Sequence, residues 1–519
     1  MIPLRFSSSQ HNLPAQMPYF NETHSADGRI RPHYAEVFAH WQSMPEEKRR
    51  ALHLRSKRLF SGDYAQDALP RILTQGEFSF LQKGVEQRAR AIIAFLRDYC
   101  TSGTRWKRVM PSHVLHSTIA RHHRGQTLKN SNPDRLAFPY GPDIIRDRSG
   151  KWRIIEDSAG ILGGIGDLVH SHKILYQLVP KFRRVLTQTP EGVAGINDPL
   201  DYFKELAQYF SQKAAQNGGI PLLYLREFTD EPDRETQRLA QCFARFGIEF
   251  ATASDPAKKL VIKEGAKAGA GIYLKQKNKT TRVGALITRD NPELFDGRTI
   301  TLDLQKFLSA KNSDDSVYLR DITRSFETAL KTPSLKSALL QGQAWTNFSP
   351  GIRFVNDKIF GLFVDSMIRG FLKEEPLLKC IPARRLSVRT RERGWQIDRQ
   401  VLSDLRRNKD KYVIKQVDED GGSGVWIGQK ESKASVQKLI DERLRKEPEK
   451  YIVQKFEHLS VLENRIVDLR LHAHVDCERI LVSNTPWGRA NWISGDGKVN
   501  ISSKGFTSPV MVMGQSDLK

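Results

Sequence analysis

Cysteine is scarce in this sequence of 519 residues, and long apolar runs are missing. The four cysteines are far apart and form no CxxC pair, which excludes a zinc ribbon and a disulfide framework. No segment reaches the roughly 20 consecutive apolar residues that span a bilayer. The opening stretch, MIPLRFSSSQHNLPAQ, lacks the continuous apolar run and cleavage site of a secretory signal. We therefore expect a cytoplasmic protein with reduced thiols and no membrane partner.

Two common nucleotide-binding fingerprints are also missing. The glycine-rich stretch EGAKAGAGIYL is not followed by a helical pattern, so we interpret it as a turn before a strand and not as a dinucleotide-binding loop. The stretch DEDGGSGV lacks the Gly-Lys-Ser/Thr that ends a Walker loop. No internal repeat is visible. These absences exclude P-loop and Rossmann fingerprints but not nucleotide binding itself.

Acidic residues are outnumbered, with 59 Asp and Glu against 82 Lys and Arg and a formal net charge of +23. Such an excess suggests a polyanionic partner, which could be nucleotide phosphates, an acidic substrate or RNA. The basic clusters Lys48–Arg58 and Arg384–Arg393 lack interleaved aromatic residues, which favours solvated faces. RNA stays open as a partner but is not favoured, because no single-strand RNA module with stacking aromatics is evident.

The chain is too long for one hydrophobic core, so several subdomains are expected. Residues from Pro45 to about Arg97 are predicted to be helical, with an interruption at Gly84. Strand patterns begin at Phe138, and the strand–helix–strand rhythm from Asp198 predicts a small α/β unit. We expect an α/β (α+β) chain with three parts: residues 1–197, 198–345 and 346–519.

The most informative stretch is GPDIIRDRSGKWRIIEDSAG, in which two strand-like runs flank Ser149–Gly150, a candidate two-residue hairpin turn. With that turn, Asp143 lies opposite Glu156, at a Cβ separation of roughly 5 Å. The two carboxylates should repel each other unless a cation lies between them. Ser158 projects from the same face as Glu156, and oxygen ligands on one strand face suit magnesium. An ordinary exposed hairpin with outward-facing charges is the alternative.

The stretch KYVIKQVDEDGGSGVWIGQ predicts a strand, a glycine-rich turn and a second strand. Lys415 ends the first strand. The successive amides of Gly421, Gly422, Ser423 and Gly424 could form a concave nest for phosphate oxygens. A plain glycine hairpin is the alternative.

Two later strands offer further binding groups. The apolar strand of KYIVQKFEHLS could present main-chain groups to an adenine edge. The candidate hinge residues there are Gln454, Lys455 and Phe456.

The stretch IVDLRLHAHVD alternates strictly, which predicts one strand with an apolar face toward a core and a polar face along a cleft. On the polar face, Arg470 is suited to hold an anionic phosphate or carboxylate through two donors. His472 and His474 have no third ligand in evidence, so a zinc site is not favoured.

These motifs occur in an order that resembles the circularly permuted ATP-grasp proteins of carboxylate–amine ligase type. In layout the chain is more distantly similar to eukaryotic glutathione synthetase and to glutathionylspermidine synthetase. The similarity extends over almost the whole chain, and each motif is modest alone, whereas the set is specific. The motifs are ADGRIRPHY, LPRILTQGEFSFLQKGVEQR, YGPDIIRDRSGKWRIIEDS, SPGIRFVNDK, FLKEEPLL, VIKQVDEDGGSGV, YIVQKFEHLS, VDLRLHAHV and VNISSKG.

The resemblance implies an ATP-grasp fold in circularly permuted order with a small Rossmann-like α/β substrate-side domain. The three parts would then be a helical region with the metal-site strands, the substrate-side domain, and the nucleotide-binding lobe with its glycine loop. They correspond to residues 1–197, 198–345 and 346–519.

The resemblance also implies roles for individual residues. Oxygen side chains would bind Mg²⁺, two lysines would clamp the ATP phosphates, and a glycine loop would cover them. Lys415 and Arg470 would carry the catalysis. By position these residues are Asp143, Glu156 and Ser158 for magnesium; Lys358 and Lys415 for the phosphates; Asp420, Gly421, Gly422, Ser423 and Gly424 for the loop; and Arg470, Asn500 and Lys504 in the final strands.

The implied activity is ATP-dependent formation of an amide or peptide bond through an acyl-phosphate, from small or peptide carboxylate and amine substrates that could be acidic. Two departures from the family pattern favour an alternative. Ser158 stands where the family usually has Asn, and Gln416 replaces the usual proline after the phosphate lysine. The alternative is a catalytically altered ATP-grasp scaffold that binds a peptide, a partner protein or RNA.

Overall fold

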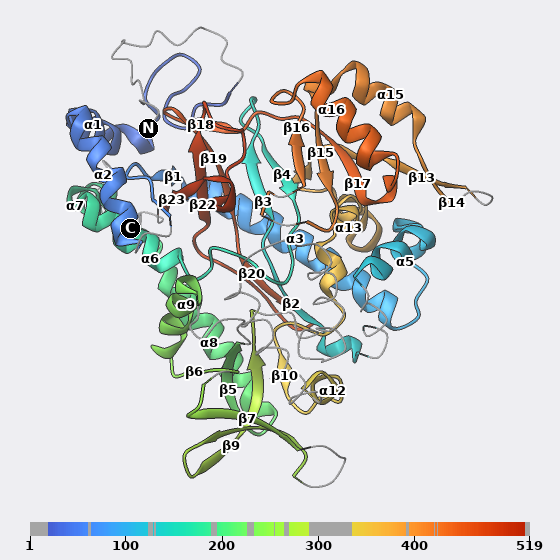
Figure 1. The fold of residues 1–519 in the computed structure, drawn as a ribbon. Helices are drawn as coiled ribbons and strands as arrows, with labels where there is room; N and C mark the ends of the chain where they lie inside the picture. The colour runs from blue at the N-terminus through green and yellow to red at the C-terminus, as the bar shows by residue number, and fades with distance from the viewer. Residues whose placement is uncertain are drawn as a thin grey trace, which may run out of the picture.

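The protein folds into mixed α/β elements arranged around three main sheets (Figure 1). The computed structural model describes residues 19–60, 64–122, 128, 131–187, 195–225, 233–253, 255–263, 269–289, 335–390, 394–419, 421–422 and 424–513.

The N-terminal region does not form one helical stretch. Helix α2 spans Glu46–Leu59 and helix α3 spans Gln75–Cys100, and the short strand β1, Arg71–Leu73, lies between them. Strand β1 is fully buried and pairs in parallel with β24, Val510–Val512. The prediction of continuous helix from Pro45 was therefore wrong at this point, because pairing with the far end of the chain overrides local helical spacing.

Gly84 does not interrupt helix α3, contrary to the prediction. A Cβ at this position would lie 2.4 Å from the Leu378 side chain, so glycine permits a close contact inside a continuous helix. The helix begins with a capping box in which Thr74 accepts a hydrogen bond from the Glu77 amide and the Glu77 carboxylate accepts one from the Thr74 amide.

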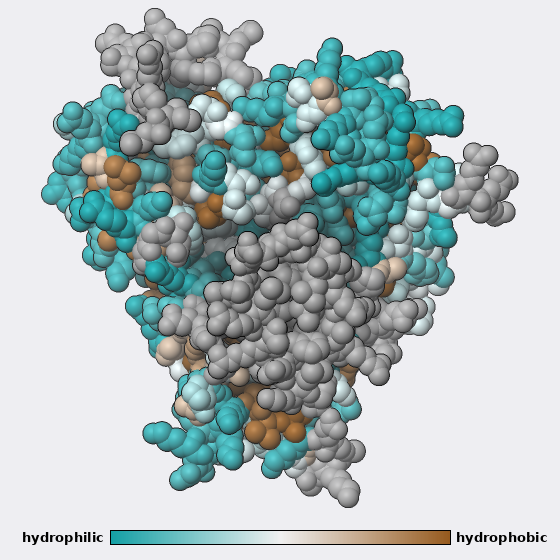
Figure 2. All heavy atoms as spheres, in the orientation of Figure 1, coloured by the Kyte–Doolittle hydropathy of each residue, from teal (hydrophilic) through white to brown (hydrophobic). Residues whose placement is uncertain are grey.

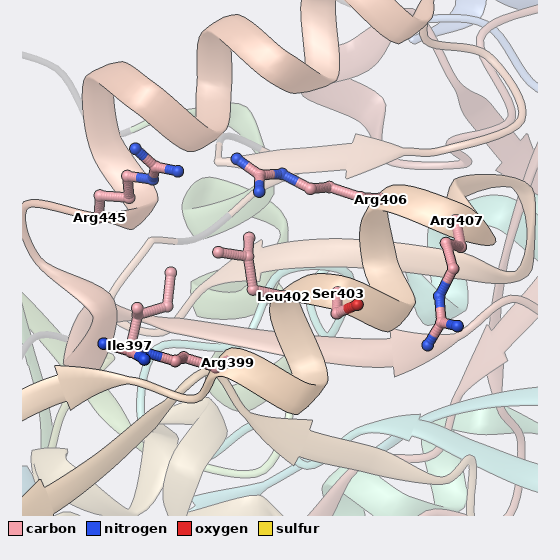
Figure 3. A pocket seen from close by; sticks show the side chains of 7 residues that line it. All are labelled: Ile397, Arg399, Leu402, Ser403, Arg406, Arg407 and Arg445. Carbon is pink, nitrogen blue, oxygen red and sulfur yellow. The ribbon is translucent and has the colours of Figure 1, made fainter.

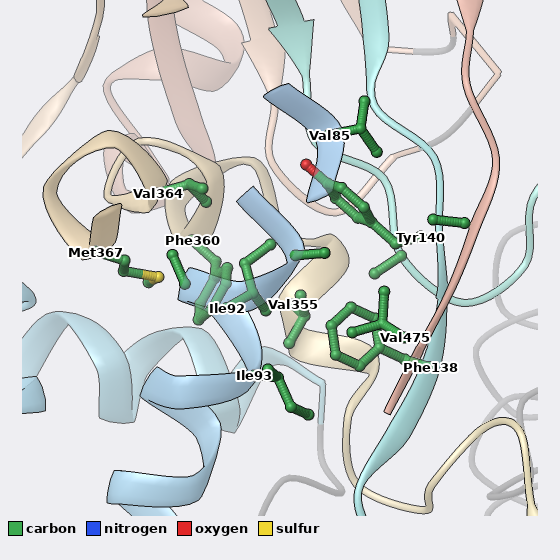
Figure 4. Close-up of a cluster of buried hydrophobic side chains, with 14 of the residues drawn as sticks. Val85, Ile92, Ile93, Phe138, Tyr140, Val355, Phe360, Val364, Met367 and Val475 are labelled. Atoms are coloured by element: carbon green, nitrogen blue, oxygen red, sulfur yellow. The ribbon is translucent and has the colours of Figure 1, made fainter. Parts of the chain in front are cut away.

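Helix α3 lies against the largest hydrophobic core (Figure 4). Side chains from α3, from strand β2 (Ala137–Tyr140) and from helix α13 (Lys358–Gly361) meet there, as Ile92, Phe138 and Phe360 illustrate. This core supports the sheet that carries the acidic hairpin, because β4 residue Ile154 and β19 residue Leu469 belong to it.

The central sheet has the strand order β11-β4-β3-β19-β22-β23, with β18 paired to β19. Most neighbours in it are antiparallel, whereas β11 runs parallel to β4. Its strands are β3 (Asp143–Arg146), β4 (Trp152–Glu156), β11 (Lys379–Cys380), β18 (Ser460–Leu462), β19 (Arg465–Arg470), β22 (Trp487–Trp492) and β23 (Phe506–Ser508).

A second, antiparallel sheet has the order β12-β17-β15-β16. Helices α15 and α16 cover one of its faces and form a separate core with it, at the upper right in Figure 1. Its elements are β12 (Ala383–Arg385), β15 (Tyr412–Gln416), β16 (Val425–Ile427), β17 (Tyr451–Lys455), α15 (Arg399–Arg407) and α16 (Lys433–Leu439).

The third sheet lies at the bottom of Figure 1 and has the order β6-β5-β9-β8-β7, with β10 beside β9. Strands β6, β5, β9 and β10 are parallel, and β8 and β7 continue the sheet in antiparallel fashion. This is the α/β unit predicted from the strand–helix–strand rhythm. Its elements are α8 (Pro199–Gln216), β5 (Ile220–Leu225), α9 (Arg234–Ala244), β6 (Glu249–Thr252), β7 (Lys258–Lys263), β8 (Gly271–Gln276), β9 (Lys279–Ile287), α12 (Leu335–Leu340) and β10 (Trp345–Thr346).

The remaining elements connect and cover these sheets. They are α1 (Ala35–Ser43), α4 (Trp106–Val109), α5 (Ser112–Arg121), β2 (Ala137–Tyr140), α6 (Leu168–Leu178), α7 (Pro180–Thr187), α13 (Lys358–Gly361), α14 (Val364–Met367), β13 (Ser387–Thr390), β14 (Gly394–Ile397), β20 (Ala473–Asp476) and β21 (Ile480–Val482).

The visible surface of the lobe that carries α15 and α16 is mainly hydrophilic (Figure 2). None of the helices in the described part of the chain combines the length and apolar character needed to cross a membrane.

Candidate functional site

The acidic hairpin is present, and Asp143 pairs with Glu156 in its ladder as predicted. The turn, however, differs from the predicted two-residue loop at Ser149–Gly150. The loop extends from Asp147 to Lys151 and is closed by the Asp147 amide, which donates to the Lys151 carbonyl. A register shift next to Asp143 offsets the longer loop and restores the predicted pairing.

Lys358 and Lys415 converge on Glu156. Lys358 begins α13 and its Nζ lies 3.3 Å from Glu156 Oε1, while Lys415 lies on β15 with its Nζ 3.7 Å from Oε2. Both lysines are buried. Burial lowers the pKa of Lys415, an effect that Glu156 opposes and Lys358 reinforces. One carboxylate therefore faces two buried lysines drawn from two different elements.

Asp143 is held by two arginines. Arg470 Nε lies 2.8 Å from Asp143 Oδ1, and Arg489 Nη2 lies 2.8 Å from Oδ2. Burial acts to raise the pKa of Asp143, but the two guanidinium groups outweigh it and hold the pKa well below its usual range. Arg489 also pairs with Asp468 through Nε, at 3.0 Å. The expected repulsion between Asp143 and Glu156 was therefore wrong, because each carboxylate has its own pair of cations.

Sequence reasoning did not find Arg489 or the buried Arg88. Arg88 Nε and Nη2 donate to the two oxygens of Asp157, at 2.9 and 2.6 Å, and the Tyr140 hydroxyl also donates to that carboxylate. Asp157 follows Glu156, so this contact fixes the end of β4 against helix α3. Alternation along the strand could have shown that Asp157 and Glu156 lie on opposite faces. It could not identify the arginine partners, because these come from distant segments of the chain. Ser158 is buried, and its carbonyl accepts from the Gly141 amide at 2.9 Å.

The glycine loop lies against the final segment of the chain. Gly421, Gly422 and Gly424 have φ angles of +66°, +80° and +64°, which favour glycine. Lys498 Nζ donates to the Gly422 carbonyl at 3.1 Å, and a Cβ on Gly422 would lie 3.0 Å from Asn500 Oδ1. The loop and the segment with Asn500 are thus brought together.

Three further residues were predicted to bind ATP: Lys504, Asp420 and Ser423. Lys504 ends the short turn after Asn500 in a left-handed conformation, with a φ of +67°. Asp420 and Ser423 lie outside the described residues. Lys358 Nζ also donates to the Glu419 carbonyl, which ties the lysine pair to the start of the glycine loop.

The predicted adenine hinge has its amides already in use. The Lys455 amide donates to the Pro382 carbonyl and the Phe456 amide donates to the Lys411 carbonyl, both at 2.8 Å. Gln454 lies in the middle of the second sheet, and its side chain donates to the Ile155 carbonyl at 3.1 Å. Binding of adenine by these three residues remains a prediction, and it would need groups other than the two occupied amides.

The alternating stretch around Arg470 does not form one strand with an open polar face, contrary to the prediction. Strand β19 ends at Arg470 and β20 begins at Ala473. His472 and His474 are buried, with Nε2 atoms 3.1 Å from the Gly163 carbonyl and 3.3 Å from an Asp476 oxygen. Burial and the charge of Arg470 lower the pKa of His472 to about 3. Within the described ranges, no group of three His, Cys, Asp or Glu side chains could hold a metal ion.

A narrow cavity of about 30 Å³ separates the central sheet from the second sheet. Strand β4 lines one wall, with Glu156 and Asp157, and Lys415 and Gln454 line the other. The lysine pair therefore lies in a cleft between two sheets, and Lys358 connects it to the Glu419 carbonyl at the start of the glycine loop.

A second hollow lies on the outer side of the same lobe and is open to solvent (Figure 3). Four arginines surround an apolar floor of Ile397 and Leu402. None of its lining residues belongs to the cavity with the lysine pair. The arginines are Arg399, Arg406, Arg407 and Arg445.

Comparison with known families shows which family the chain belongs to. Residues 70–223 and 312–488 match the family model described as circularly permuted ATP-grasp type 2. The chain belongs to this family. Membership confirms the predicted ATP-grasp fold. ATP-grasp proteins bind ATP, so membership also implies that this chain binds ATP.

The chain is similar to several curated proteins. It is 23% identical to an uncharacterized protein of Synechocystis sp. over 88% of each chain, and 23% identical to an uncharacterized protein of Mycobacterium tuberculosis over 95% of this chain and 84% of that one. It is also 24% identical to a Frankia alni protein provisionally named glutamate–cysteine ligase 2-3, over 80% of this chain and 43% of the relative.

Among solved structures, the chain is similar to a glutathione synthetase-like effector from Globodera pallida in its apo form. The match covers 89% of this chain and 96% of the effector, with 10% identity and a TM-score of 0.48. The family assignment rests on the family model and not on this similarity.

Proposed function

We propose that the protein is an ATP- and magnesium-dependent ligase that joins a carboxylate to an amine through an acyl-phosphate. The observation that carries the proposal is the pair of buried lysines on Glu156, in a cleft between two sheets. Arg470 is linked to this position through Asp143, which pairs with Glu156 in the hairpin. The provisional name of the Frankia alni relative supports a carboxylate–amine ligase in general. We also keep the expectation of a cytoplasmic location.

The lysine pair has the properties of a phosphate clamp. Lys358 and Lys415 are positively charged side chains from α13 and β15 that share one carboxylate. Phosphate oxygens form charge-assisted hydrogen bonds with lysine, so ATP can replace Glu156 as their partner. When ATP takes the place of Glu156 on the two lysines, the Glu156 oxygens would become free beside the triphosphate.

The oxygen groups around this position fit magnesium in their chemistry. Glu156, Asp143 and Ser158 would hold the ion, since magnesium prefers carboxylate and hydroxyl oxygens together with substrate phosphates. Bound magnesium supplies neutralisation of the phosphate charge. The residues themselves would keep the hairpin rigid, because Arg88 fixes Asp157 next to Glu156.

The reaction itself needs little covalent chemistry from the protein. A substrate carboxylate oxygen attacks the γ-phosphorus, and ADP leaves with the electron pair of the broken P–O bond. The amine nitrogen then attacks the acyl carbon, phosphate leaves, and the nitrogen loses a proton. Arg470 would hold the anionic intermediate, and the narrow cleft with its glycine loop would exclude water that hydrolyses it.

Gln416 is one of the two departures from the family pattern, and it has a structural use here. Its amide donates to the Gly424 carbonyl at 2.8 Å and closes the base of the glycine loop, which a proline could not do. This contact indicates that Gln416 changes how the glycine loop is closed but does not remove its function. We therefore prefer the active enzyme to the catalytically altered scaffold.

The test is a reaction of the purified protein with magnesium-ATP and pooled amino acids and peptides. We expect ADP release and a condensation product detected by mass spectrometry. If ATP raises the melting temperature but no pool releases ADP above background, the scaffold alternative is favoured and the ligase proposal fails.

A further inference from the structure

A second glycine-rich segment, Gly160–Gly166, connects the proposed reaction centre to helix α9. On one side, the Gly163 carbonyl accepts from Arg470 Nη1 at 3.4 Å and lies 3.1 Å from His472 Nε2. On the other side, the amides of Gly164 and Gly166 both donate to Glu235 Oε1, at 2.8 and 3.3 Å. One loop therefore fixes Glu235 at a set position relative to Arg470.

Glycine is required at two places in this loop. Gly164 has a φ of +95°, and a Cβ there would lie 2.0 Å from the Trp487 ring. A Cβ at position 166 would lie 2.1 Å from the Glu235 carbonyl oxygen. No side chain fits at either position. The backbone can therefore approach Glu235 closely enough for the Gly164 and Gly166 amides to donate to the same oxygen.

The Glu235 carboxylate is held by one oxygen only. Arg289 Nη2 lies 3.1 Å from Oε1, the oxygen that already accepts from the two glycine amides. No hydrogen bond to Oε2 is formed by any residue that the structure describes, and Oε2 lies 3.9 Å from the position of a Cβ on Gly163. The Glu235 side chain is 18% exposed, so a ligand can reach it.

Neighbouring carboxylates differ in this respect. Both oxygens of Asp143 face guanidinium groups, both oxygens of Glu156 face lysines, and both oxygens of Asp157 accept from Arg88. Among the residues that the structure describes, Glu235 is thus an anion whose hydrogen bonds all go to Oε1, and Gly163 and Gly164 connect it to Arg470.

We propose that Glu235 Oε2 binds the ammonium group of the amine substrate beside Arg470 and accepts one of its protons, which leaves the nitrogen lone pair free to attack the acyl carbon. This inference rests on the proposed ligase function. A carboxylate that three donors already orient loses little conformational freedom when it binds a cation, and Arg289 offsets the cost of holding its charge in a partly buried place. The substrate class is an aliphatic amine that is protonated in solution, such as the amino group of an amino acid or peptide.

The variant Glu235→Gln tests the proposal, because glutamine keeps an acceptor oxygen for the glycine amides and removes the charge. Two amines are tested, each together with the carboxylate substrate identified from the amino acid and peptide pool. One is the cationic amine from the same pool, and the other is hydroxylamine, which is largely uncharged at mildly alkaline pH. We expect the KM for the cationic amine to rise about tenfold, while hydroxamate formation and the KM for ATP stay within about twofold of wild type.

The matched control is Glu249→Gln, which changes an exposed carboxylate on the same α/β unit. It should leave all three quantities unchanged. If Glu235→Gln does not fold, methylammonium added to the wild type takes its place, and it should inhibit use of the cationic amine but not of hydroxylamine.

Three outcomes are distinguishable. An unchanged KM for the cationic amine in Glu235→Gln, or no competition by methylammonium, overturns the proposal. A change in the KM for the carboxylate alone also overturns it, and would indicate that Glu235 occupies a carboxylate subsite. A wild-type protein that forms no hydroxamate with any carboxylate refutes the ligase function itself.

Discussion

Charge compensation among single residues explains how the buried Asp143 and the partly buried Glu156 can lie side by side in the hairpin. Glu156 faces Lys358 and Lys415, and Asp143 faces Arg470 and Arg489. A carboxylate that neutralises buried cations contributes to stability mainly because its removal leaves those cations without a partner. The pairs are therefore both structural and available for exchange with a charged ligand.

Glu156→Gln should destabilise the protein in the absence of nucleotide by about 3 kcal/mol, because two buried lysines would then face each other without an anion. ADP release should be lost as well. The measurement is urea denaturation of both proteins without ATP. Adding Lys358→Met to the variant should recover part of the loss in unfolding free energy, and a single variant as stable as wild type would contradict this account of the pair.

Asp167 gives a prediction about pH. Burial and the nearby charge of Glu235 raise its pKa to about 7, although Arg238 opposes the shift, and Tyr64 donates a hydrogen bond to the carboxyl. The raised pKa means that the folded protein keeps a proton that the unfolded chain releases, so this group stabilises at low pH and its contribution is lost as pH rises through about 7.

Relative to Asp167→Asn, the wild type should therefore lose stability between about pH 4 and about pH 7. Melting temperatures of both proteins across this range measure the difference. Parallel curves for the two proteins would show that Asp167 is ionised throughout.

At the scale of elements, the glycine loop offers a test with an internal control. Gly422→Ala should cost about 1 to 2 kcal/mol locally, because alanine is disfavoured at a φ of +80°, and its Cβ would approach Ser503 Oγ at 2.9 Å. Since the strain falls on the loop that would cover the phosphates, we expect a higher KM for ATP with little change in global stability.

Gly394→Ala is the matched control for that variant. Gly394 has a φ of +67° in the β13–β14 hairpin, and a Cβ there meets nothing within 4 Å. Gly394→Ala should show the same cost of backbone strain with no change in the KM for ATP. Equal KM values for ATP in both variants would argue against a phosphate-covering loop.

The elements also show how far sequence reasoning could go. Alternation predicted β3, β4 and β15, since these depend on neighbours along the chain. The Asp143–Glu156 pairing was predicted from a two-residue turn that the structure does not have, and it holds because a register shift offsets the longer loop. Local sequence patterns missed the break between β19 and β20 and the pairing of β1 with β24, because both depend on contacts with distant strands. Arg489 and Arg88 were missed for the same reason. An arginine has no local pattern that reveals a buried carboxylate partner elsewhere in the chain.

In the molecule as a whole, the two sheets that form the cleft are linked by the Lys415–Glu156 ion pair and by hydrogen bonds to one carbonyl. Lys415 Nζ and Gln454 Nε2 both donate to the Ile155 carbonyl, at 3.2 and 3.1 Å, and so link the second sheet to β4 of the central sheet. The cavity between the sheets measures about 30 Å³, whereas ligand pockets usually measure about 300 to 1,000 Å³. Under the proposed function, nucleotide binding at the lysine pair requires the sheets to separate, and each hydrogen bond to Ile155 opposes that separation.

Gln454→Leu removes one of these two links and leaves the lysine pair in place. A hydrogen bond of this kind contributes about 1 kcal/mol, so the open form should become about fivefold more populated, and a fluorescent ATP analogue should bind faster by a similar factor. Stopped-flow fluorescence measures the association rate. Gln437→Leu, on the exposed face of α16, is the control and should bind at the wild-type rate. If Gln454→Leu also binds at that rate, separation of the two sheets does not limit access of ATP to the lysine pair.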